Sequence, residues 1–247
     1  MRYAILALLA MASIAAGAAP CTVHSDAHVR ALVELYTSEG CSSCPPADHW
    51  LSKLAASGDP RVVPLAFHVS YWDYIGWKDR FADPRYTQRQ AELAAARGTS
   101  MVYTPQVLIA GGDSRKWSDA RAVEAALASI AGKPAAARIT LTSAPAGSSG
   151  IEGTASMELP RAAGDAVLFV ALTQDGLSSR VTAGENRGER LEHRAVARGF
   201  ATQRGASVAF RFTPQPDWDL SRMSLVAFVQ DTRTGHVLQA LSAPVCR

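Results

Sequence analysis

This 247-residue sequence lacks the motifs of several common enzyme chemistries. No G-x-S-x-G pattern indicates a nucleophilic serine, and no glycine-rich loop of the phosphate-binding kind is present. The arginines are scattered and the formal net charge is only +3, so we expect no nucleic-acid partner. Beyond the first twenty residues no segment approaches the length of a transmembrane helix, so we expect no membrane span. The hydrophobic fraction of 48% predicts a globular protein, which we expect to be a monomer.

The first residues have the pattern of a secretory signal. Arg2 supplies a positive start, residues 5–14 are apolar, and residues 15–19 are small, as signal peptidase requires. We therefore predict a signal peptide over residues 1–19, cleaved near Ala18 or Ala19. Pro20, directly before Cys21, argues against a lipid anchor. The expected location is periplasmic or secreted.

Cysteine is scarce, and its four copies allow three pairings. Cys41 and Cys44 are close enough to pair locally, which leaves Cys21 and Cys246 at the two ends of the mature chain. Disulfides persist outside the cytoplasm. We therefore predict a structural Cys21–Cys246 disulfide, with two free thiols as the alternative.

The first half of the mature chain alternates strand and helix patterns. Pro45 and Pro46 directly follow Cys44, and proline suits the first turn of a helix because its missing N–H has no partner there anyway. Helices are also predicted where Asp83–Pro84 and Ser118 begin amphipathic stretches. The predicted strands are 31–36, 61–69 and 106–110, and the predicted helices are 45–58, 83–98 and 118–132.

The sequence changes character after Pro134. Short apolar runs separated by Gly, Pro, Ser and Asp clusters predict strands without helices, a pattern typical of a β-sandwich. These strands are 139–142, 166–172, 208–212, 225–229 and 237–241. The predicted fold is thus an α/β domain over residues 20–133, followed by an all-β sandwich-like domain over residues 134–247.

A Cys-x-x-Cys pair at the start of a helix suits thiol–disulfide exchange. Unpaired N–H groups and the positive end of the helix dipole favour a thiolate there. In this interpretation Cys41, exposed just before the helix, attacks a substrate disulfide. Cys44, less accessible in the first turn, then resolves the mixed disulfide.

These motifs resemble known families. Residues 33–44 resemble the thioredoxin-fold superfamily. They contain, in order, a strand, a tyrosine, a turn and the cysteine pair. Together with the segments 34–48, 66–79, 103–106 and 184–188, they resemble the DUF1223 family of secreted bacterial proteins. The resemblance implies a thioredoxin-like N-terminal domain in which Thr104–Pro105 is a cis-proline that helps to hold the substrate strand. It implies no organic cofactor, since the disulfide is the redox group, and it implies protein thiol or disulfide clients with an unknown redox partner.

Four further residues have candidate roles. Glu34, on the strand that leads to the cysteines, is either the proton acceptor for Cys44 or a residue in a structural pair. Trp72 and Trp77 are candidate walls of a peptide groove, with packing as the alternative, and Asp73 is a candidate for orienting a polar group. The segment 184–193 reads as a polar hairpin, either a solvated turn or a contact to the first domain or a partner.

Two rival functions use the same cysteines. Cys41, Cys44 and His49 form a C-x2-C-x4-H pattern, but zinc needs a fourth ligand and no second Cys-x-x-Cys pair exists. Copper(I) is satisfied by two thiolates and could recruit His68. The other rival is a binding protein in which the pair is a structural disulfide. Disulfide exchange is the favoured hypothesis, and it assigns no metal ligands.

Overall fold

A computed structural model describes residues 19–146, 150–159 and 165–247. The predicted signal peptide therefore lies, except for Ala19, outside the described residues. Within the described part, no helix has the length and apolar character needed to cross a membrane.

The first half contains the predicted helices and strands, each within about two residues of its expected bounds. Proline begins both α1 and α2, and Asp83 and Asp119 accept backbone N–H bonds at the starts of α2 and α3. A short 3-10 helix, η1 (Asp73–Ile75), was not predicted. The elements are β2 (Ala31–Thr37), α1 (Pro45–Ser57), β3 (Val62–His68), α2 (Pro84–Ala96), β4 (Gln106–Ile109), β5 (Gly112–Asp113) and α3 (Ala120–Ile130).

In the second half, residues 138–146, 150–159 and 165–247 contain strands and one 3-10 helix, η2 (Leu220–Arg222). The predicted strands are β6 (Arg138–Ala146), β8 (Ala166–Gln174), β12 (Ser207–Phe212), β13 (Met223–Asp231) and β14 (Val237–Pro244). Across both halves, six of the described strands escaped prediction because they are short or mixed in polarity: β1 (Cys21–His24), β5, β7 (Gly150–Glu158), β9 (Leu177–Arg180), β10 (Arg190–His193) and β11 (Val196–Gln203).

One eight-stranded sheet joins the two halves of the chain. Its order is β14-β13-β8-β11-β3-β2-β4-β5. β2 pairs in parallel with β3 and antiparallel with β4, while Val196 of β11 pairs with Ala66 of β3. The segments that the sequence analysis separated at residue 133 therefore share a sheet.

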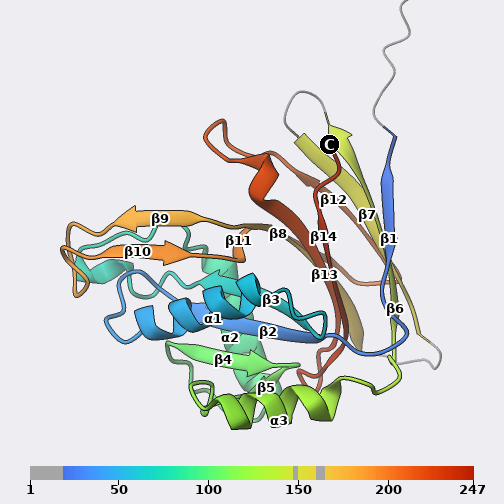
Figure 1. The fold of residues 1–247 in the computed structure, drawn as a ribbon, viewed down its shortest axis with the longest axis horizontal. Coiled ribbons are helices and arrows are strands. Elements are labelled where there is room, and N and C mark those ends of the chain that lie inside the picture. Colours follow the sequence, from blue (N-terminus) through green and yellow to red (C-terminus); the bar gives the residue numbers. More distant parts are fainter. Residues whose placement is uncertain (1–18, 147–149, 160–164) are drawn as a thin grey trace, which may run out of the picture.

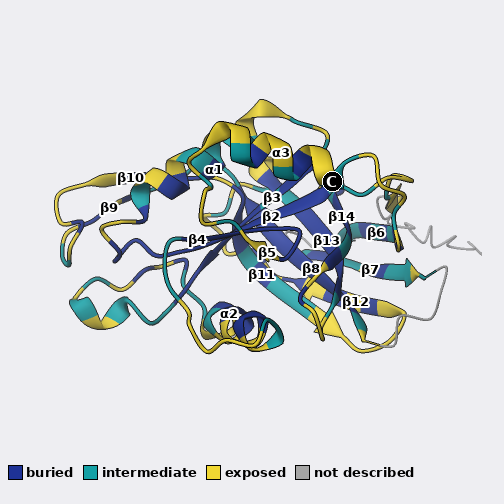
Figure 2. Cartoon of the chain, turned by 90° about the horizontal axis from the view of Figure 1, so that it is seen from below, coloured by how far each residue is buried: buried dark blue, intermediate teal, exposed yellow. Residues whose placement is uncertain are grey.

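Helices cover both faces of the N-terminal strands, with α1 and α3 on one side and α2 on the other (Figure 2). The alternation of β2 explains this, because successive side chains of a strand point to opposite faces. Val33 and Leu35 pack with residues of α1 and α3. Leu32 and Tyr36 pack with residues of α2.

A second, four-stranded sheet, β1-β6-β7-β12, lies at the end of the molecule opposite the β9–β10 hairpin (Figure 1). Its inner residues, among them Ile139 and Phe210, form a core with Leu168 of β8 and Leu225 of β13. The predicted Cys21–Cys246 disulfide is present, with a Cα–Cα distance of 5.7 Å. It joins β1 of this sheet to the chain after β14.

Candidate functional site

Cys41 and Cys44 form a disulfide at the start of α1. Their Cα atoms are 5.4 Å apart, and Cys44 is the N-cap residue of the helix. The Cys44 N–H donates to the carbonyl of Cys41, while the hydroxyl of Ser43 lies 3.3 Å from Cys41 Sγ. The pair thus lies where the helix dipole stabilises negative charge on sulfur.

Both cysteines are fully buried, so the expectation that Cys41 is exposed is wrong. The loop between β9 and β10 covers the pair. The side-chain amide of Asn186 donates to the carbonyl oxygens of Glu39 and Cys41, at 2.8 and 3.0 Å. The carboxylate of Glu185 accepts the Ser42 N–H at 2.9 Å. The segment considered a solvated turn therefore contacts the cysteine loop directly.

Trp72 connects the cysteine loop to the segment before β4. Its indole N–H donates to Thr104 Oγ1 at 2.7 Å, and a Cβ added at Gly40 would lie 3.2 Å from Trp72 Cβ. The Thr104–Pro105 peptide bond is cis. Trp72 and Thr104, predicted to bind substrate, are thus brought together beside the residue that precedes Cys41.

Trp77 and Asp73, the other two candidates from the segment 66–79, make hydrogen bonds to residues near the cysteine loop. The indole N–H of Trp77 donates to Glu39 Oε2 at 3.0 Å. Asp73 accepts the backbone N–H of Asp79 at 3.2 Å. Burial raises the pKa of Asp73 above its usual value, and the Asp79 N–H partly offsets this. Trp77 and Asp73 therefore help to fix the positions of Glu39 and Asp79.

Glu34 lies on the α2 face of β2 and forms a buried ion pair with Arg89, at 2.7 Å. Tyr36 donates a longer hydrogen bond to the same carboxylate oxygen. The Arg89 Cζ atom lies 4.8 Å from the ring centroids of both Phe169 and Phe228. The structure thus gives Glu34 the pairing role, on the face of the sheet away from α1.

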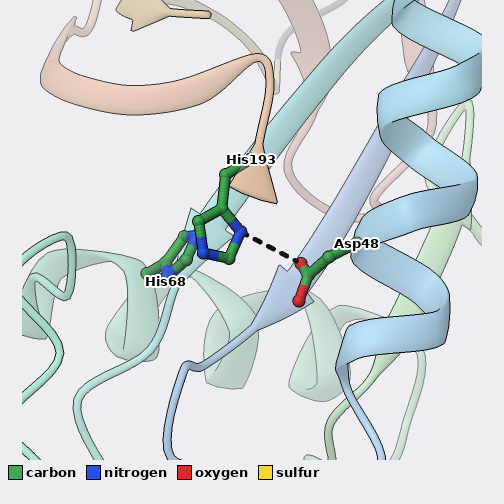
Figure 3. A group of neighbouring side chains, drawn as sticks. All are labelled: Asp48, His68 and His193. Carbon is green, nitrogen blue, oxygen red and sulfur yellow. Dashed lines mark ion pairs between the residues drawn. The ribbon is translucent and has the colours of Figure 1, made fainter. Parts of the chain in front are cut away.

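Five ionisable side chains form a buried polar cluster next to the cysteine loop. Figure 3 shows three of them, Asp48 from α1, His68 from β3 and His193 from β10, with their side chains turned toward one another. His68 Nδ1 lies 2.6 Å from Asp79 Oδ2, and His193 Nε2 lies 3.2 Å from Glu39 Oε1. His68 is therefore held by Asp79, and His193 is held by Glu39, with a longer ion-pair contact of 4.0 Å from His193 Nδ1 to Asp48 Oδ1 (Figure 3).

The charges in this cluster stabilise one another. Burial raises the pKa of Glu39 and of Asp79 and is the largest single effect on each. The hydrogen bond from His193 to Glu39, the charge and hydrogen bond of His68 beside Asp79, and the other hydrogen bonds to each carboxylate together hold both pKa values below normal. Burial lowers the pKa of His68, yet the adjacent Asp79 raises it above normal overall. Asp48 differs: burial raises its pKa, and the more distant histidines offset this only in part.

Three atoms of the cluster are buried without a hydrogen-bond partner: Asp48 Oδ2, His68 Nε2 and His193 Nδ1. Each such atom costs about 1–3 kcal/mol, because its bonds to water are lost and not replaced. A pocket of about 290 Å³, lined partly by Asp48 and His193, opens beside them. A larger pocket, of about 480 Å³ between α3 and β14, contains none of the predicted site residues.

The geometry of the cysteines does not support the alternative function, in which they bind zinc or copper(I). Their sulfurs are bonded to each other, His49 is exposed, and His68 Nδ1 faces Asp79. Among the described residues, the group that brings three metal-type ligand atoms together contains neither cysteine.

Sequence reasoning missed several residues of this site. They share one signal: each lies inside or at the end of a segment that resembles the DUF1223 family, or in the hairpin that continues from one. These residues are Glu39, Asp48, Asp79, Glu185, Asn186 and His193.

One comparison with known proteins identifies the family, and another finds a similar fold. The family model described as "Protein of unknown function (DUF1223)" matches residues 32–230. The crystal structure of protein AGR_C_4864 from Agrobacterium tumefaciens is similar, with 25% identity and a TM-score of 0.63, over 90% of this chain and 96% of that one. A domain of the outer membrane lipoprotein Omp28 from Porphyromonas gingivalis matches at 15% identity and a TM-score of 0.30, over 45% of this chain and 89% of that domain. No curated protein matches.

Proposed function

The chain belongs to the DUF1223 family, and we propose that it is an exported thiol–disulfide exchange protein that acts through Cys41 and Cys44. The single observation behind this proposal is the Cys41–Cys44 disulfide at the N-terminus of α1. A helix start stabilises the thiolate that must leave or attack during exchange.

The chemistry balances with the cysteine pair alone. A client thiolate attacks Cys41 Sγ, the Cys41–Cys44 bond breaks, and Cys44 leaves as a thiolate at the helix start. The client's second thiolate then attacks the client sulfur of this mixed disulfide and expels Cys41 as a thiolate. The client dithiol has lost two electrons and the protein has gained them. Each step is reversible, so the reduced pair performs the opposite reaction on a client disulfide.

The surroundings of the pair support a thioredoxin-like domain. Strands β3, β2 and β4 lie side by side, α1 and α2 cover opposite faces, and cis-Pro105 precedes β4. Trp72, bonded to Thr104, would form one wall of a client groove beside Gly40. The β9–β10 loop must move aside before a client sulfur reaches Cys41.

Burial of both sulfurs favours a second candidate, in which the disulfide only stabilises the fold. The two candidates differ in reduction potential. Structural disulfides of exported proteins usually lie below about −300 mV, whereas exchange proteins lie between about −270 and −120 mV.

The test is a redox titration of the mature chain, combined with a Cys44→Ala trap. For exchange we expect a potential within the second range, and mixed disulfides between Cys41 and client proteins in a periplasmic extract. The double variant Cys41→Ala/Cys44→Ala is the matched control and should trap nothing. A potential below about −300 mV, with no mixed disulfide, would assign the pair to the structural role.

A further inference from the structure

We propose that Asp48, His68 and His193 bind one divalent transition-metal ion, zinc by the chemistry of its ligands, beside the Cys41–Cys44 disulfide. This site uses neither cysteine, and the proposal does not rest on the proposed exchange activity.

The first support is the convergence of unpartnered ligand atoms. The potential ligand atoms of the three residues all lie within 4.8 Å of one another, and all three residues are buried. Asp48 Oδ2, His68 Nε2 and His193 Nδ1 have no hydrogen-bond partner. The other Asp48 oxygen, Oδ1, lies 4.0 Å from His193 Nδ1, too far for a hydrogen bond. Buried polar atoms are nearly always satisfied in folded proteins, so three unpartnered atoms on three adjacent side chains indicate a missing common partner. A cation satisfies all three at once.

The second support is that each histidine is oriented as a metal ligand. An ionised carboxylate only accepts hydrogen bonds, so the nitrogen that faces Asp79 or Glu39 carries the proton. The opposite nitrogen of each ring, His68 Nε2 or His193 Nδ1, is the one turned into the cluster. Carboxylates behind ligating histidines are the usual outer shell of zinc sites.

The carboxylates of that outer shell are themselves fixed. Asp79 accepts the backbone N–H groups of Glu39 and Phe81, both at 2.9 Å. Glu39 accepts the indole N–H of Trp77. The imidazole rings are therefore held in place by a network and not by isolated contacts.

The ligand set selects the ion. Two imidazoles and one carboxylate suit zinc, whereas calcium and magnesium prefer oxygen ligands throughout. Zinc bonds of about 2.0–2.1 Å place tetrahedral ligand atoms about 3.3 Å apart, so binding would draw these side chains slightly inward. The pocket beside Asp48 and His193 leaves room for water as a fourth ligand and offers a route for entry.

The ligands come from three elements, α1, β3 and β10, so the ion would fasten the hairpin to the cysteine helix. Asp48 follows Cys44 by one helical turn, and its N–H donates to the Cys44 carbonyl. His193 ends the hairpin whose loop covers Cys41. A metal here would therefore hold that cover closed.

The test is zinc binding to the mature chain with both disulfides oxidised, which removes the cysteines as ligands. After stripping with a chelator, titration with zinc chloride should show one ion per chain. His68→Gln and His193→Gln should each weaken binding about 100-fold or more, and the outer-shell variant Glu39→Gln about 10- to 100-fold. His49→Gln is the matched control, since His49 is exposed and lines the same pocket, and it should bind like the parent.

A cobalt(II) titration of the unmutated chain keeps the test valid if a variant misfolds. We expect the intense visible absorption of four-coordinate cobalt, lost on addition of one equivalent of zinc. Less than one tenth of an equivalent of zinc bound, or equal loss in His49→Gln and His193→Gln, would overturn the proposal. Zinc bound only after reduction of the disulfides would overturn it as well and assign the metal to the cysteines.

Discussion

The side-chain amide of Asn186 donates a hydrogen bond of 3.0 Å to the carbonyl oxygen of Cys41, 145 residues earlier in the chain. A second bond from the same amide reaches the carbonyl of Glu39. These two bonds hold the β9–β10 loop over the cysteine pair. They make the loop a cover whose opening we expect to control the reactivity of the disulfide.

Asn186→Ala should therefore speed reduction of the Cys41–Cys44 disulfide. Two lost hydrogen bonds of about 1 kcal/mol each raise the population of the open loop roughly 30-fold. The measurement is the rate of reduction by dithiothreitol, followed by alkylation and mass spectrometry. Arg187→Ala, a change at an exposed neighbour, is the control and should react like the parent. An unchanged rate in Asn186→Ala would show that the loop does not limit access.

Trp72→Phe should weaken the use of peptide clients without exposing the disulfide. The substitution keeps an aromatic ring but removes the N–H that bonds Thr104, a loss of about 1 kcal/mol or roughly fivefold in kcat/KM. The assay is reduction or oxidation of a two-cysteine peptide. Trp117→Phe is the matched control, because the Trp117 ring packs against Trp50 and the hydrogen bond to Thr104 comes from Trp72. Equal effects of both changes would argue against a client groove at Trp72.

Glu34→Gln should destabilise the fold by about 3–5 kcal/mol, because it leaves the charge of Arg89 buried without its partner. The double variant Glu34→Gln/Arg89→Met should recover part of that loss, since no buried charge remains. Urea unfolding of Glu34→Gln, Arg89→Met and the double variant measures the three free energies of unfolding. The pH profile of Cys44 alkylation should be unchanged in Glu34→Gln, since its carboxylate is engaged on the α2 face. A shifted profile would restore Glu34 as the proton acceptor.

Removal of the terminal bridge should cost stability but not reactivity. Cys21 and Cys246 are 225 residues apart in sequence, so opening their disulfide frees a very long loop in the unfolded chain, worth about 3–5 kcal/mol. The double variant Cys21→Ser/Cys246→Ser should lower the free energy of unfolding by that amount. Its rate of reduction at Cys41–Cys44 should match the parent. A loss below about 1 kcal/mol would show that packing of β1 against β6 already fixes the two ends.

Local pattern was enough to predict much of the fold. Pro45–Pro46 and Asp83–Pro84 begin helices for reasons contained within one turn of chain, so α1 and α2 begin where expected. Apolar runs such as 225–229 bury both faces and were predicted as strands. By contrast, β7 and β10 mix polar and small residues, and only their pairing partners make them strands.

The direction in which a side chain points could not be predicted from the sequence, because it depends on tertiary packing. The sequence alone placed Glu34 on the strand before the cysteines, but the face it occupies depends on where α2 packs. His193 looked like the end of a polar turn, and nothing near it in sequence indicates Asp48, which lies 145 residues earlier. Such contacts arise only when β10 is brought against α1.

The sequence by itself determined the family, the paired cysteines at a helix start, the terminal bridge and most helices and strands, because each depends on residue type and short spacing. Only the tertiary structure decided that both cysteines are covered, that Glu34 pairs with Arg89, and that two histidines and an aspartate converge. The physical reason is that burial and convergence depend on which distant segments share a surface, and that is set by packing of the whole sheet.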